Sequence, residues 1–195
     1  MRVKLRELTI SGDMFPHSDD EEDQFYELSA YVVDTLLSAT PTEVEVTDGT
    51  LLLSQLLTSK AVYGLFQNAS LMSSPLLYKY FSGDVTAAVS EVLTYSVLSD
   101  VYKVDLLDIV PMRAVKYLGV ITDAFLEPDK MSDELASRFG SRKPLFIEVR
   151  GSASGRRLYE KAERAFRNLE TARYPNAYGL FSLVVRDSVN LVFVR

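Results

Sequence analysis

The stretch Pro144-Leu-Phe-Ile-Glu-Val-Arg-Gly-Ser152 predicts a strand that carries an acid and a base among apolar residues. Side chains alternate between the two faces of a strand. Alternation divides this strand into two sets, Leu145, Ile147 and Val149 on one face and Phe146, Glu148 and Arg150 on the other. Charges are rarely buried without a partner or a function. Glu148 and Arg150 are therefore either an ion pair at a strand end or part of a site that holds a metal ion beside a phosphate.

The composition limits the chemistry that the chain can perform. Its 195 residues fit one domain with a small subdomain, and 47% hydrophobic and 25% charged residues are ordinary for a globular protein. The absence of cysteine excludes disulfides, thiol catalysis and zinc–thiolate sites, and it fits an intracellular protein. His17 is the only histidine, which argues against a histidine triad or a multi-histidine metal site. Catalysis would rest on carboxylates, Lys, Arg, Tyr or Ser.

Two segments of the first half were compared with targeting and membrane-spanning sequences, and neither resembles one. Residues 1–10 alternate in polarity, unlike a signal peptide. The longest uncharged stretch, residues 61–78, contains serines, Gln67, Asn68 and Pro75, and makes a poor membrane span. We expect a cytoplasmic protein that does not contact the membrane.

The net charge of -6 hides an asymmetry between the two halves of the chain. Residues 1–100 carry 5 Lys and Arg against 15 Asp and Glu, whereas residues 101–195 carry 16 against 12. Any contact with a polyanion is therefore expected in the second half.

The first 83 residues predict a mostly helical region packed on a core. Residues 2–10 and 42–47 read as short strands, and a helix over residues 21–38 begins in the acidic run Asp19–Asp23. Residues 50–81 are helical in pattern, apolar and almost uncharged. This last segment either packs on the sheet or forms the surface of a homodimer or of another protein complex.

Residues 84–195 predict an α/β core with a mixed central sheet flanked by helices. The expected order is a helix over 85–102, strands over 106–117 and 120–127 joined by a tight turn, a short helix over 132–138, the Glu148 strand, a helix over 156–173, and strands over 177–185 and 189–194.

Three carboxylates stand out because little other charge surrounds them. Asp123 is the only charge between Lys116 and Glu127, and lies in the strand before Glu148. Neighbouring strands would place these two carboxylates within reach of each other, and oxygen ligands favour Mg²⁺ or Mn²⁺. Glu91, in a helix that is apolar on almost every side, either supplies a third carboxylate or faces a narrow polar edge open to water.

With these residues in place, the chain resembles the restriction-endonuclease-like, or PD-(D/E)xK, nuclease superfamily over roughly residues 84–195. The resemblance is carried by Thr122-Asp-Ala-Phe-Leu126, by Ile147-Glu-Val-Arg-Gly-Ser152, and by the order of the elements. It implies a restriction-endonuclease-like fold in which Asp123 and Glu148 bind the metal, Glu91 completes the metal site, and Arg150 has the role of the basic residue.

Two positions depart from the pattern of that superfamily. Thr122 stands where proline is usual, and Arg150 stands where the family has lysine. Arginine stays protonated and cannot act as a general base, but it can bind a phosphate or stabilise developing negative charge. Lys161 and Lys116 are candidates to supply a lysine from elsewhere in the chain.

The helix after Gly155 has a basic face. Arg157, Lys161 and Arg164 recur at helical spacing, and Arg156 precedes them. This face either follows a DNA backbone or is a solvated surface on which Glu160 and Glu163 pair with it locally. Tyr159, Phe166 and Leu169 are expected in the core.

Two functions remain open at this point. The first is a metal-dependent nuclease that hydrolyses DNA phosphodiester bonds with Mg²⁺ or Mn²⁺. The second is a catalytically inactive protein of the same fold that binds nucleic acid or serves in a protein assembly, as Arg150 and the acidic first half suggest.

Overall fold

A computed structural model describes residues 1–16, 22–58, 83–112, 122–152, 157–173 and 176–195. The strands are β1 (Arg2–Ile10), β2 (Thr42–Glu45), β3 (Val110–Pro111), β4 (Ala124–Leu126), β5 (Leu145–Ser152), β6 (Tyr178–Val185) and β7 (Ser188–Val194). The helices are α1 (Glu22–Ser38), α2 (Asp48–Thr58), α6 (Gly83–Asp100), α7 (Asp133–Phe139) and α8 (Leu158–Arg173). Within these residues, no helix is both long and apolar enough to cross a membrane.

The described strands form one mixed sheet in the order β2-β1-β7-β6-β5-β4-β3. β4 runs antiparallel to both of its neighbours, β3 and β5, whereas β5 and β6 run parallel. A parallel pair needs a crossover connection, and α8 provides it. β7 is antiparallel to β6 and parallel to β1, and β2 pairs with β1 in antiparallel fashion. The predicted α/β class with a mixed sheet flanked by helices is confirmed.

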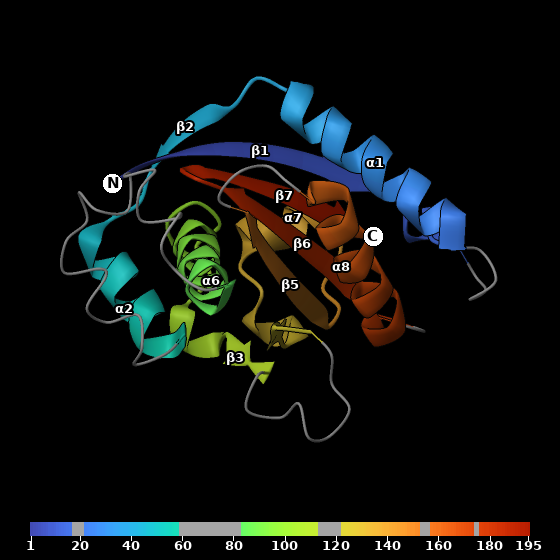
Figure 1. Cartoon of the computed structure of the whole chain (residues 1–195). Coiled ribbons are helices and arrows are strands. Elements are labelled where there is room, and N and C mark those ends of the chain that lie inside the picture. Colours follow the sequence, from blue (N-terminus) through green and yellow to red (C-terminus); the bar gives the residue numbers. More distant parts are fainter. Residues whose placement is uncertain (17–21, 59–82, 113–121, 153–156, 174–175) are drawn as a thin grey trace.

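Helices cover both faces of this sheet (Figure 1). One face packs against α6, whose side chains join a large apolar cluster with residues such as Val92, Ile147 and Leu191. The other face packs against α1 and α8 in a second cluster that contains Phe166 and Phe181. α2 lies against α6 on its outer side (Figure 1).

Residues 1–83 contribute to the same sheet as the second half of the chain. β1 pairs with β7 along seven residues, from Lys4 with Ser188 to Ile10 with Val194. α2 exposes Leu52, Leu53 and Leu56. Residues 59–82, most of the segment expected to form a dimer or partner surface, lie outside the described residues, and so does His17.

The antiparallel strand pair expected before Glu148 is present, but its first strand begins later than predicted. The segment expected as a strand from residue 106 begins with a 3-10 turn, Leu106–Asp108, because the Asp105 side chain accepts a hydrogen bond from the Leu107 N–H. Among the described residues of this segment, Val110–Pro111 pairs with β4, and residues 113–117 of the predicted strand lie outside the described part of the chain. Pro111 lacks an N–H, which suits the edge of a sheet. The predicted turn at residues 118–119 lies outside the described residues.

Candidate functional site

β5 presents Glu148 and Arg150 to the α8 side of the sheet, as alternation along the strand predicts. Ile147 and Val149 belong to the apolar cluster under α6, whereas Phe146 packs with the cluster under α8. Glu148 is fully buried, and the Arg150 side chain is 27% exposed. The charged pair therefore lies at the boundary between the sheet, α8 and solvent.

Asp123 lies beside β5, directly before the first residue of β4. Its N–H donates to the Ile147 carbonyl at 3.0 Å, which extends the ladder of hydrogen bonds between the two strands. Its Oδ2 accepts the Val149 N–H at 2.9 Å. Asp123 thus pairs with β5 through both its backbone and its side chain, and the side chain is only 4% exposed.

Arg150 bridges the two carboxylates. One guanidinium nitrogen lies 3.1 Å from Asp123 Oδ2 and 2.9 Å from the Val149 carbonyl, and the other forms an ion pair with Glu148 Oε1. Two carboxylates at such short range repel each other unless a cation lies between them. The expected approach of Asp123 to Glu148 is confirmed, and the cation that joins them here is the guanidinium.

Asn168 of α8 is part of this site and was not expected from the sequence. Its Nδ2 donates to Glu148 Oε1 at 2.8 Å, so the carboxylate is held from the helix as well as from Arg150. Its spacing in the sequence could have indicated this role. Asn168 follows Lys161 and Arg164 at intervals of seven and four residues, which places all three on the same face of the helix.

Lys161 reaches the site from the first turns of α8. Its Nζ donates to the Gly151 carbonyl, one residue beyond Arg150. Burial lowers the pKa of Lys161, and the positive charges of Arg150 and Arg157 lower it further. Lys161 therefore lies close enough to Arg150 to sense its charge. The other candidate lysine, Lys116, lies outside the described residues.

Gly151 allows α6 to pack tightly behind this part of β5. A Cβ at this position would lie 2.9 Å from the Thr86 carbonyl and would overlap the Ser90 hydroxyl. Only glycine fits here, so the backbone next to Arg150 is fixed by its contact with α6.

Glu91 is not brought together with the other two carboxylates. It is buried on α6, which covers the face of the sheet opposite to Glu148. Among the described residues, no group of three or more Asp, Glu, His or Cys side chains is placed to hold a metal ion. Mg²⁺ is commonly held by one or two carboxylates, with water and substrate phosphate as its other ligands. Asp123 and Glu148 fit that pattern in number and in convergence, without Glu91.

The basic residues predicted on one face of α8 differ in their exposure and in their partners. Arg157 lies 3.9 Å from Glu160, and both side chains are well exposed. Arg164 is exposed. Arg167 pairs with Glu163 at 3.1 Å and lies over the Phe25 ring. Arg156 lies outside the described residues.

Tyr159 was expected in the core, and this prediction is wrong. The residue is 36% exposed, its ring contacts the Tyr26 ring edge-on, and its hydroxyl donates to Asp34 at 2.8 Å. Phe166 and Leu169, predicted as core with it, are fully buried. The reason is the helix period: Tyr159 sits on the outer side of α8, where it meets α1.

Comparison with known proteins gives no relative: no family model, no curated protein and no solved structure matches this chain. The function must therefore be inferred from the residues and their geometry.

Proposed function

We propose that the protein is a metal-dependent nuclease that hydrolyses DNA phosphodiester bonds, built like the restriction-endonuclease-like superfamily. One observation carries the proposal: the buried carboxylates of Asp123 and Glu148, from neighbouring strands, converge on a single cationic group. The order of the elements also supports it. A helix, a β-hairpin, the strand with Glu148 and Arg150, a second helix on the other face and two strands follow one another as in that superfamily.

Asp123 and Glu148 would hold Mg²⁺ or Mn²⁺. When bound, such an ion lowers the pKa of a water molecule and polarises a phosphoryl oxygen. The protein contributes the positions of the two carboxylates. The Val149 N–H fixes Asp123 and the Asn168 amide fixes Glu148, so the two groups keep their orientation when Arg150 moves away.

Arg150 acts on the phosphate and does not act as a base. A guanidinium remains protonated and binds a phosphate with two parallel hydrogen bonds. In the structure it contacts Asp123 Oδ2 and Glu148 Oε1, which are also oxygens that a metal would use. A metal ion and Arg150 therefore compete for the carboxylates. A phosphate at the site gives Arg150 a new partner, so DNA and metal bind better together than either does alone.

The direct test is incubation of single-stranded, duplex and branched DNA with the protein and Mn²⁺. We expect cleavage by the wild type, and loss of cleavage in Asp123→Asn and Glu148→Gln. The control is Asp133→Asn, which changes a fully exposed carboxylate on α7 and should leave cleavage unchanged. Equal absence of cleavage in the wild type and in Asp123→Asn would exclude catalysis on these substrates.

The second candidate is a catalytically inactive protein of the same fold that binds nucleic acid or serves in a protein assembly. It is favoured by the ion pairs of Arg150, which give both carboxylates a positive partner without any metal. In this case neither the wild type nor Arg150→Lys cleaves DNA. DNA binding would still weaken in a Lys161→Gln, Arg164→Gln double variant, because Arg164 is exposed and Lys161 brings a second positive charge next to Arg150. A homodimer or partner contact through residues 50–81 remains a prediction for either function.

A further inference from the structure

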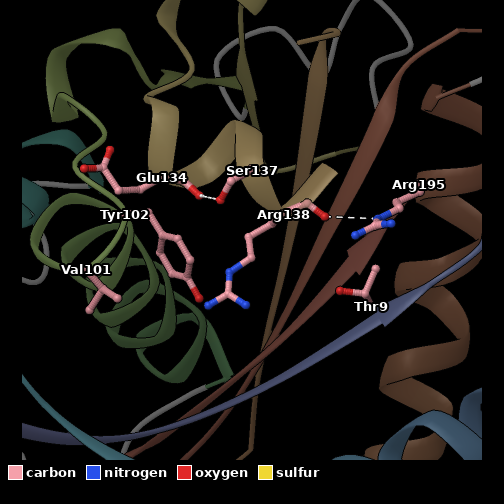
Figure 2. A pocket seen from close by; sticks show the side chains of 7 residues that line it. All are labelled: Thr9, Val101, Tyr102, Glu134, Ser137, Arg138 and Arg195. Atoms are coloured by element: carbon pink, nitrogen blue, oxygen red, sulfur yellow. Dashed lines mark hydrogen bonds between the residues drawn. The ribbon is translucent and has the colours of Figure 1, made fainter. Parts of the chain in front are cut away.

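A pocket of about 430 Å³ lies on the α6 side of the sheet, away from the carboxylate pair. It is bounded by the end of α6, by α7, by β1 and by Arg195 (Figure 2). Thr9 forms part of it, on the face of β1 where Val3 and Leu5 pack beneath α6. Glu148 faces α8, and two strands, β7 and β6, separate β1 from β5. The pocket is therefore a separate site.

Arg138 of α7 is held rigidly at one side of this pocket. One of its terminal nitrogens lies 3.0 Å and 3.1 Å from the two carboxylate oxygens of Glu7. Its guanidinium carbon lies 5.9 Å from the ring centroids of both Tyr102 and Phe193. The Tyr102 hydroxyl donates to Glu7 as well. Burial, and then Glu7, raise the pKa of Tyr102 far above its usual range, so this phenol stays protonated and keeps donating.

Arg195 is fixed at the opposite side of the pocket and has donors to spare. Its N–H donates to the Ile10 carbonyl at 3.1 Å, and its own backbone oxygen accepts from the Gly12 N–H at 2.7 Å. Its Nε donates to the Arg138 carbonyl at 3.0 Å. Within the described part of the chain, its two terminal nitrogens make no hydrogen bond or ion pair.

Hydrogen-bond donors from α7, from β1 and from Arg195 therefore surround one space. Figure 2 shows the guanidinium groups of Arg138 and Arg195 on either side of it, with the Thr9 hydroxyl between them. The Glu134 carboxylate turns away, while the Ser137 hydroxyl donates to the Glu134 carbonyl at 2.7 Å. A planar carboxylate is best bound from one side by a single fork of donors. Donors on several sides suit a tetrahedral anion better.

We infer that this pocket binds the phosphate group of a small phosphorylated molecule. Its volume lies in the range of small-molecule sites, roughly 300–1,000 Å³. A long polyanion suits it less well, because Glu7 pairs with Arg138 there and residues 1–100 carry a net charge of -10.

The test is calorimetric titration of the full chain with inorganic phosphate, with a nucleoside monophosphate and with a short DNA duplex. We expect the nucleotide to bind, and Arg195→Gln to weaken binding by about tenfold, the equivalent of one charged hydrogen-bonding group. Thr9→Val should weaken it by less. Arg142→Gln, which removes an exposed arginine paired with Asp133 on the outside of α7, should bind as the wild type does.

Several outcomes would overturn the inference. They are the absence of binding by either phosphate compound, equal affinity in Arg195→Gln and wild type, and tighter binding of the duplex than of the nucleotide with the same dependence on Arg195. Thermal unfolding of Arg195→Gln checks that the variant is folded. The Thr9→Val variant tests the phosphate site a second time, without a change of charge. The result does not depend on nuclease activity, because the two sites share no residue.

Discussion

Asn168 and Glu148 join α8 to β5 through a hydrogen bond of 2.8 Å between the amide Nδ2 and the buried Oε1. The same oxygen forms an ion pair with Arg150. The helix therefore takes part in holding the carboxylate, and a change in Asn168 should alter the site without touching Asp123 or Arg150.

Asn168→Ala should lower the free energy of unfolding by about 1.5–3 kcal/mol, as expected when a hydrogen bond to a buried charged group is lost. Urea denaturation measures this. The control is Thr171→Ala, which removes an exposed hydroxyl on the same helix and should change stability by less than about 0.5 kcal/mol. If the two variants are equally stable, the amide contributes nothing to holding Glu148.

Arg150→Met tests whether the guanidinium takes the place of a metal ion between the two carboxylates. It leaves two buried carboxylates without their shared counter-charge, which typically costs about 3–5 kcal/mol. Mn²⁺ should then raise the melting temperature of the variant more than that of the wild type, because the ion no longer competes with Arg150 and binds only the folded protein.

The control for this experiment is the double variant Arg150→Met, Glu148→Gln, which should lose the response to Mn²⁺. Differential scanning calorimetry with and without Mn²⁺ measures the shift in melting temperature of each protein. Equal shifts in wild type and Arg150→Met would show that Arg150 and the metal do not use the same oxygens.

Gly151→Ala should destabilise the protein by about 1–3 kcal/mol through overpacking. The added methyl would meet the Thr86 carbonyl at 2.9 Å, and a backbone atom cannot move aside as a side-chain end can. Gly49→Ala is the matched control, because nothing lies within 4 Å of a Cβ there. A Gly151→Ala variant as stable as Gly49→Ala would mean that α6 is free to shift away from β5.

The sequence predicted most elements of the core because their hydrophobic patterns are strong. β5, α8, β6 and β7 occur within one or two residues of their predicted positions, and alternation correctly placed Glu148 and Arg150 on one face. One result depended on tertiary structure that a linear pattern does not contain. The strand pairing that brings Asp123 to Val149 could be expected, but the choice of Arg150 as the shared partner of both carboxylates could not.

The same limit explains the residues that the sequence missed. Asn168 carries no charge, so it did not stand out on a helix rich in Arg and Glu. Glu91 stood out as an isolated acid, yet α6 packs on the face opposite to Glu148. Helical spacing shows which residues share a face of one element, but not which face of the sheet that element will cover.

Lys161 should make stability depend on pH in the alkaline range. Burial lowers its pKa in the folded protein below the 10.5 of an ordinary lysine. Between the lowered pKa and 10.5 the unfolded chain binds more protons than the folded one, so this side chain favours folding increasingly as the pH rises. The difference in unfolding free energy between wild type and Lys161→Met should therefore shift in favour of the wild type from pH 8 to 10.5. Urea denaturation at several pH values measures it.

Lys130→Met is the control for that experiment, because its lysine behaves in the opposite way. A hydrogen bond to Asp108 raises the pKa of Lys130 above 10.5, so its contribution stays constant up to that pH and falls only beyond it. A flat difference for Lys161→Met across the same range would mean that Lys161 is fully solvated in the folded protein and does not sense Arg150. A rising difference would place an amine with a lowered pKa beside the carboxylate pair, within reach of the Gly151 carbonyl.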